Sequence, residues 1–181
     1  MDYLLLTILG LLPSFIWLCF FLFFDVHPES KRMVLKIFIW GMLSTLPILG
    51  VFKILIWLGV IEEIENIIAF SVIVLSLNTL FWATIEEVMK YLVVRYNVLK
   101  SSEFDEPVDI MLYMIIAGVG FAAFENILVL LGAHPVLTLP EIFILAFLRF
   151  ISATIGHALW SGLIGYYMAL SFFEPKKRKK F

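Results

Sequence analysis

Long apolar runs separated by short polar segments dominate the chain. Most runs can cross a bilayer as a helix, because a hydrocarbon core of about 30 Å needs roughly 20 apolar helical residues. The pattern predicts an all-α, polytopic membrane helix bundle that forms a single domain over residues 1–181. We expect about five transmembrane helices, at residues 3–24, 37–60, 67–98, 110–131 and 141–173.

The ends of these runs carry further structural signals. The first run has no basic flank and no small-residue cleavage site, so we expect a retained span and not a cleaved signal peptide. Pro47 predicts a kink in the second run, and Pro107 is placed to open the fourth helix. The third and fifth runs exceed one crossing, and their surplus near residues 67–77 and 141–148 can form short interfacial or re-entrant helices.

Composition supports a membrane protein and argues against a nucleic-acid partner. Apolar residues make up 62% of the chain and charged residues only 15%, whereas soluble domains carry about a quarter charged residues. The net charge is −2, and the one basic run lies at residues 176–180. Cys19 is the sole cysteine, which excludes an internal disulfide and a thiolate zinc cluster.

The distribution of lysine and arginine predicts an orientation in the cell membrane. With the N-terminus outside, the segments on the inner side hold Lys31, Arg32, Lys36, Arg95, Lys100 and the basic residues of 176–180. The segments on the outer side then hold none, as the positive-inside rule requires. We therefore predict a multi-pass protein with an external N-terminus and a cytoplasmic C-terminus.

Charged and polar side chains interrupt the last three apolar runs. They are Glu86, Glu87 and Lys90 in the third run, Glu125 and Asn126 in the fourth, and Arg149, His157 and Ser161 in the fifth. Ionisable groups within a membrane span cost several kcal/mol and usually face a protein interior or water. The small pairs Gly118/Ala122 and Ser152/Gly156 would let these helices approach closely. We therefore predict a polar pocket shared by three helices.

Such a pocket could support two kinds of hydrolytic chemistry. A glutamate can take a proton from a water molecule while His157 and Asn126 polarise a carbonyl. Alternatively, a divalent metal such as zinc can be held by imidazole and carboxylate ligands. The ligands would be Glu86, Glu87, Glu125 and His157. Glu86 and Lys90 are one helical turn apart, so we expect them to pair.

Other functions are compatible with the same residues. The charges could form interhelical ion pairs that only fix the bundle. A small ion- or proton-coupled transporter also places such groups near the membrane midplane, but the polar residues here are confined to the last three runs, with no internal repeat. A non-enzymatic immunity or scaffold protein that binds a partner helix is a further alternative.

Three short motifs on the last three runs resemble one protease family. EEVMK at 86–90, FAAFEN at 121–126 and HALWSG at 157–162 are similar, in this order, to the EExxK, FxxxEN and HxxWS motifs of the PrsW family of intramembrane proteases. Asp109 and Arg149 also look like family positions. The similarity covers about residues 84 to 165, nearly half of the chain.

The resemblance implies both site residues and a class of substrate. Glu86, Glu87, Glu125 and His157 would form the active site, supported by Lys90, Asn126, Arg149 and Ser161. The family is grouped with metalloproteases and is related to the CAAX-processing and bacteriocin-processing group, in which glutamate-activated water is used. Some members perform site-one cleavage of single-span anti-sigma factors. The related group has a histidine where this chain has Glu125, so metal dependence stays open.

The sequence thus leads to the hypothesis of an intramembrane endopeptidase that cuts in or near the outer half of the membrane. Glu86 is the expected general base, assisted by Glu87, and Lys90 would keep Glu86 ionised. His157 and Glu125 would position the water or metal and stabilise the oxyanion. A single-span membrane protein, unwound near the pocket, is the expected substrate.

Overall fold

The computed structural model describes residues 2–59, 77–101 and 104–173, and this part of the chain is helical, with no strand. The predicted all-α fold class is therefore confirmed. The helices are α1 (Tyr3–Phe23), α2 (Lys31–Leu43), α3 (Thr45–Trp57), α5 (Leu77–Asn97), α6 (Pro107–Ala133), α7 (Leu139–Ile151) and α8 (Ala153–Phe173).

Four stretches within the described residues are long and apolar enough to cross a membrane. They are Tyr3–Phe23, Lys31–Trp57, Pro107–Ala133 and Leu139–Phe172. Helix α5 has a suitable length of 21 residues but carries four charged side chains, Glu86, Glu87, Lys90 and Arg95. A fifth crossing at α5 therefore remains a prediction.

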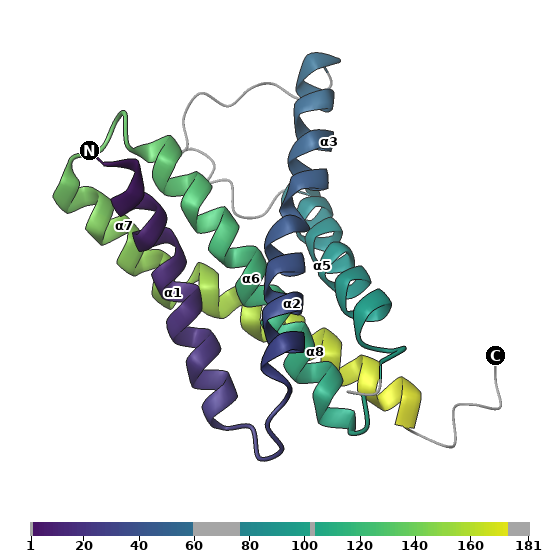
Figure 1. Ribbon diagram of the computed structural model, residues 1–181. Coiled ribbons are helices and arrows are strands. Elements are labelled where there is room, and N and C mark those ends of the chain that lie inside the picture. Colours follow the sequence, from purple (N-terminus) through teal and green to yellow (C-terminus); the bar gives the residue numbers. More distant parts are fainter. Residues whose placement is uncertain (1, 60–76, 102–103, 174–181) are drawn as a thin grey trace.

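Helix α6 is the centre of the bundle. It packs against α8, α1 and α2, and it runs through the middle of the molecule with α8 crossing it (Figure 1). In its most apolar window 67% of the residues are buried, against 17–22% for the other three spans. Pro107 occupies its first turn, as the sequence predicted. Since α6 is buried on most sides, its neighbours leave their outer faces to lipid.

Close approach between helices depends on glycines of α6. A Cβ atom on Gly118 would lie 2.8 Å from the backbone oxygen of His157 and 2.8 Å from Oγ of Ser161. A Cβ on Gly120 would collide with the backbone oxygen of Phe38 on α2. The predicted role of Gly118 in helix packing is thus confirmed, and its contact sets the distance between α6 and the polar part of α8.

The second apolar run is divided into α2 and α3 at Ser44. Pro47 has no N–H to donate to the carbonyl of Leu43, so the helix is interrupted one turn before the proline. The hydroxyl of Ser44 donates to the Gly41 carbonyl (2.6 Å), and that of Thr45 to the Met42 carbonyl (2.7 Å). These bonds satisfy carbonyl groups that the break would otherwise leave without a partner.

The last apolar run is likewise two helices, α7 and α8, which meet at Ser152. The indole Nε1 of Trp17 on α1 donates to the Phe150 carbonyl (3.0 Å), and the hydroxyl of Thr154 donates to the Arg149 carbonyl (3.1 Å). The sequence predicted surplus length in this region, and the structure places it in α7. The corresponding prediction for the third run falls largely on residues 67–76, which lie outside the described residues.

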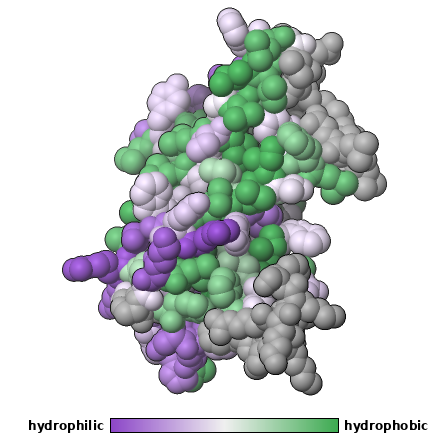
Figure 2. Space-filling view, turned by 90° about the vertical axis from the view of Figure 1, so that its right-hand side faces the viewer, coloured by the Kyte–Doolittle hydropathy of each residue, from purple (hydrophilic) through white to green (hydrophobic). Residues whose placement is uncertain are grey.

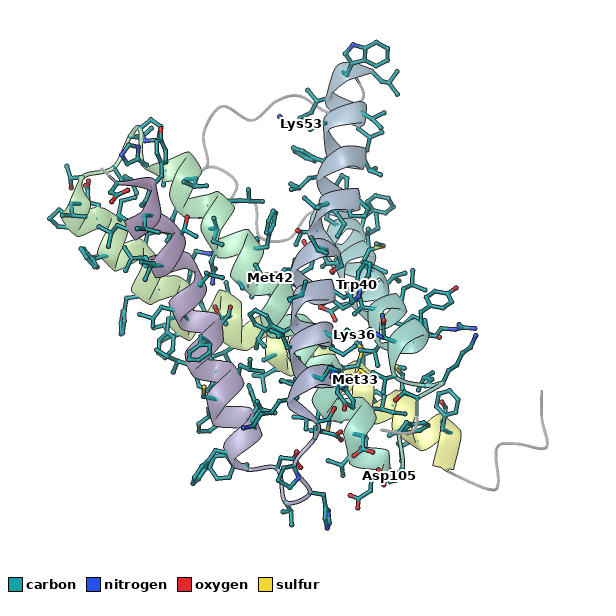
Figure 3. The ribbon with its side chains drawn as sticks, viewed as in Figure 1. Met33, Lys36, Trp40, Met42, Lys53 and Asp105 are labelled. Atoms are coloured by element: carbon teal, nitrogen blue, oxygen red, sulfur yellow. The ribbon has the colours of Figure 1, made fainter. Side chains whose placement is uncertain are left out.

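Polar and apolar side chains are separated along the bundle. Hydrophobic atoms cover the upper part of the face turned to the viewer in Figure 2, and hydrophilic ones gather in its lower half. Asp105 lies at the lower end of the bundle and Lys36 about half-way up, whereas Lys53 lies near the upper end of α3 (Figure 3). Residues 61–66 and 176–180, which the orientation prediction also uses, are outside the described residues.

A carboxyl cluster joins the α1–α2 loop to the start of α6. The phenol of the buried Tyr113 donates to Glu29 Oε2 (2.5 Å), and Asp109 Oδ2 accepts from the backbone N–H of Glu106 (2.7 Å). The pKa of Glu29 is raised from 4.5 to about 7, mainly by burial; the bond from Tyr113 opposes the rise, and the neighbouring Asp109 and Asp25 contribute to it.

We expect this raised pKa to make the folded protein less stable at higher pH. Between pH 4.5 and 7 folded Glu29 keeps a proton that the unfolded chain has lost, so stability falls as pH rises through this window. Because solvent screens this half-buried group, the effect should be about 1 kcal/mol, or roughly 2–4 °C in Tm. Melting curves in detergent at pH 5 and pH 8 measure it. Glu29→Gln should abolish the difference; an undiminished difference in that variant would assign it to other groups.

Candidate active site

His157 lies at the centre of a polar cluster formed by α5, α6 and α8. Its Nε2 is 2.9 Å from Glu125 Oε2 on α6, and its Nδ1 is 2.8 Å from Lys90 Nζ on α5. Glu86 Oε2 lies 4.0 Å from the same Nδ1. The structure therefore brings together residues from the three runs in which the sequence predicted a shared pocket.

The partners of His157 assign its tautomer. A lysine ammonium group can only donate hydrogen bonds, so Nδ1 must accept from Lys90. The proton of the neutral ring is then on Nε2, which donates to the Glu125 carboxylate. Both ring nitrogens are used, and the imidazole is fixed between an ammonium group on one side and a carboxylate on the other.

Lys90 pairs with Glu87, and not with Glu86 as the sequence predicted. The distance from Lys90 Nζ to Glu87 Oε1 is 2.6 Å, and Ser161 donates to the other oxygen of Glu87 (2.9 Å). A lysine can reach carboxylates three or four residues earlier on a helix, and here the bonds from α8 select the nearer one. Lys90 is fully buried, with Nζ 4.3 Å from the centre of the Phe121 ring.

Arg149 forms an ion pair with Glu125, and Asn126 accepts a hydrogen bond from Arg149. Arg149 lies in the last turn of α7, with Nη2 2.9 Å from Glu125 Oε2, and its Nε donates to Asn126 Oδ1 (2.5 Å). The Asn126 amide in turn donates to the Thr154 hydroxyl (3.1 Å). Asn126 is only 1% exposed, and both of its polar atoms are engaged. In this structure Asn126 therefore holds Arg149, and its predicted action on a substrate carbonyl stays a prediction.

Thr154 is a member of this cluster that the sequence analysis missed. It is fully buried, and its hydroxyl links Asn126 of α6 to the carbonyl of Arg149 across the α7–α8 break. A threonine in an apolar run draws less notice than a charge, because its hydroxyl can bond within its own helix. Its place one turn before His157 was the available signal.

Glu86 lies on the wall of an open groove and, unlike Glu87 and Glu125, has no ion pair with Lys or Arg among the described residues. This groove, which we call the α5–α8 groove, has a volume of about 860 Å³ and is lined by residues between 80 and 91 of α5 and between 153 and 171 of α8. Glu86, Glu87 and His157 are on its wall, and the rest of the lining is largely apolar. Glu87 is already bonded to Lys90 and Ser161, which leaves Glu86 as the carboxylate free to act on a molecule in the groove.

Gly156 also lines the α5–α8 groove, which corrects its predicted packing role. A Cβ atom at this position would meet no atom of the described structure within 4 Å. Its lack of a side chain therefore leaves space beside His157 and does not bring two helices together.

The proposed metal ligands do not fit a resident divalent cation in this arrangement. Among the residues that the structure describes, no three His, Cys, Asp or Glu side chains form a metal-binding group. Glu87 and His157 both face the ammonium of Lys90, and Glu125 faces the guanidinium of Arg149. A dication at this site would be repelled by two cations that hold the same donors.

Comparison with known proteins points to one family. A family model described as PrsW family intramembrane metalloprotease matches residues 29–181. A Protease PrsW of Geobacillus kaustophilus is 33% identical over 94% of this chain and 68% of its own length. A Protease PrsW of Bacillus subtilis is 30% identical over 94% of this chain and 70% of its own length. A Protease PrsW of Oceanobacillus iheyensis is 27% identical over 94% of this chain and 71% of its own length. No solved structure matches.

Proposed function

The chain belongs to the PrsW family of intramembrane metalloproteases and is a peptidase, and we propose that it cuts a single-span membrane protein at the Glu86–His157 site. The observation that carries this proposal is the position of Glu86, the uncommitted carboxylate, on the wall of an apolar groove and 4.0 Å from His157. Membership of a peptidase family favours this function over the carrier and the scaffold considered above.

In this proposal Glu86 is the general base. Glu86 lines the groove, and a water molecule there can donate a hydrogen bond to its carboxylate. The carboxylate can then take a proton from that water as the oxygen attacks a carbonyl. The same proton can then pass to the leaving nitrogen. Glu87 keeps Lys90 in place and does not take part directly.

The developing oxyanion would be stabilised by the positive side of the site. His157 reaches the groove wall, and the ammonium of Lys90 lies 2.8 Å behind its Nδ1. A fixed cation in a site with little water stabilises negative charge more strongly than it would in bulk water. Glu125, held by Arg149 through an ion pair, keeps the imidazole ring in position.

We further propose that the substrate is cut in or near the outer half of the cell membrane. This location follows from the orientation with an external N-terminus, which rests on the lysine and arginine distribution. An anti-sigma factor with a single transmembrane helix is one suitable substrate, since cleavage near its outer end would start its release. Protease accessibility of tags at the two termini, measured in intact cells, tests the orientation.

The direct test is cleavage by the purified protein. The full chain, reconstituted in liposomes, is incubated with a panel of single-span test proteins that includes anti-sigma factors, and products are identified by mass spectrometry. We expect one cut at the membrane-embedded or outer juxtamembrane part of at least one test protein. Binding without any cut, across the whole panel and in several lipids, would contradict the proposed peptidase reaction.

We expect chelators to leave this cleavage nearly unchanged. Lys90 already contacts Glu87 and His157, and Arg149 is paired with Glu125. These cations occupy the side chains that would bind a metal, so in our proposal Glu86 activates the water without one. Rates are measured before and after treatment with EDTA and 1,10-phenanthroline, with the metal content determined in parallel. If activity is lost and is restored by zinc, the site rearranges around a metal and the water-only route is wrong.

A further inference from the structure

The glycines of α8 divide into two kinds by what lies opposite them. Cβ atoms on Gly162 and Gly165 would lie 3.0 Å from Ile115 and 2.7 Å from Met111, so these two glycines serve the contact with α6. A Cβ on Gly156 would meet no described residue within 4 Å, and Gly156 lines the α5–α8 groove next to His157. Ala153, one turn earlier, lines the same groove. Small residues thus leave an open space directly beside the candidate site.

The dimensions of the groove suit an extended peptide. Its lining on α8 runs from residue 153 to residue 171, a length of about 27 Å at 1.5 Å per helical residue. An extended chain at about 3.3 Å per residue fills this length with roughly eight residues. Hydrolysis also requires an extended segment, because the peptide groups of a helix are enclosed by their own hydrogen bonds.

The chemistry of the lining favours a peptide over lipid chains. The lining is largely apolar, and its carboxylate and imidazole groups, those of Glu86, Glu87 and His157, form one polar point beside Gly156. Acyl chains have no groups to bond there, whereas a peptide has N–H and C=O groups that must be satisfied in an apolar setting. The polar point coincides with the open space at Gly156.

We propose that the α5–α8 groove binds the substrate as an extended apolar segment, and that the space at Gly156 accepts a side chain next to the bond that is cut. Residue 156 is then a specificity-determining position: its size limits the size of the substrate side chain. This inference rests on the proposed function and adds where the substrate lies and what selects it.

A size series at residue 156 tests the selection. Gly156→Ala, Gly156→Val and Gly156→Leu are compared on paired test proteins that carry alanine or phenylalanine at each position flanking the cut. We expect the ratio of alanine to phenylalanine cleavage, at one of these positions, to rise at least tenfold from glycine to leucine. Gly50→Leu on α3 is the matched control, because a Cβ at Gly50 also meets no atom of the described part of the chain within 4 Å. A ratio that stays constant over the series at every flanking position, whatever the absolute rate, overturns the proposal.

Cross-linking separates this inference from the proposed peptidase reaction. The sole cysteine, the exposed Cys19, is replaced by serine, and Gly156→Cys is combined with Glu86→Gln so that substrate is not consumed. A bifunctional maleimide should join this cysteine to single cysteines within the transmembrane segment of a test protein, and Gly50→Cys should give no such product. Cross-links without any cleavage by the wild type would support the groove and contradict the reaction. Cleavage by the wild type without cross-links at residue 156 would support the peptidase reaction and contradict binding of the substrate in the groove.

Discussion

Replacing Glu86 with glutamine is expected to slow peptide cleavage by about 10²- to 10⁴-fold, the contribution typical of a general base. Glutamine keeps the size of the side chain but cannot accept the proton of the attacking water. Of the carboxylates in the cluster, Glu86 alone has no Lys or Arg within ion-pair distance among the described residues: Glu87 is paired with Lys90, and Glu125 with Arg149. The rate is measured with excess enzyme in a single turnover, so that product release does not mask the chemical step.

The Glu86→Gln variant should keep the wild-type fold. Glu86 faces the groove and holds no other helix in place through an ion pair with Lys or Arg, so the melting temperature in detergent should change little. Glu87→Gln provides the comparison, because it removes the counter-charge of Lys90 and one of the two oxygens that accept from Lys90 and Ser161. It should destabilise the bundle as well as reduce activity. Full activity in Glu86→Gln would remove Glu86 from the role of base.

Replacing Lys90 with methionine should produce the largest loss of stability among the site variants. Lys90 is fully buried, and its removal leaves Glu87, whose side chain is only 18% exposed, without its counter-ion. Breaking a buried ion pair from one side costs about 3–5 kcal/mol. The free energy of unfolding can be followed by circular dichroism during titration with a denaturing detergent. Lys53→Met, on the exposed side of α3, should have little effect.

A double variant shows whether the stability lost in Lys90→Met comes from the ion pair with Glu87 or from the packing of the Lys90 side chain. Glu87→Gln combined with Lys90→Met removes both charges, so most of the lost stability should return. Cleavage should remain low in both variants, because the cation behind His157 is missing from each. If the double variant is as unstable as Lys90→Met, the aliphatic part of Lys90 and its contact with the Phe121 ring matter more than the ion pair.

Most of the fold could be predicted because membrane helices are encoded in single runs of sequence. The length of an apolar run sets a helix, and a proline at the first turn sets the start of α6. The breaks at Ser44 and Ser152 were harder to place. Each depends on hydroxyl or indole groups that bond the freed carbonyls, and the partner of Phe150 comes from α1, 133 residues earlier.

The residues of the site could be predicted for a similar reason, but their contacts could not. A charged side chain in an apolar run is costly unless it faces other polar groups inside the protein. Such side chains are therefore expected to meet in the bundle interior, and Glu86 and Glu125 do both lie at His157. Helical spacing allows Lys90 to reach two carboxylates, and only the neighbouring helix decides between them. A glycine packs against another helix or leaves a space depending on which residues face it in the folded bundle. The order of residues along the chain does not give that information. Gly118 and Gly156 show the two outcomes.

The hydrogen bond from Trp17 to Phe150 has a practical consequence for shortened versions of the protein. The family match starts at residue 29 and so excludes α1, yet Trp17 of α1 bonds to the residue directly after Arg149. An expression fragment trimmed to the matched region would lose this support for the arginine that holds Glu125. Low activity of such a fragment would then reflect an incomplete scaffold, and inhibitor screens should use the entire chain.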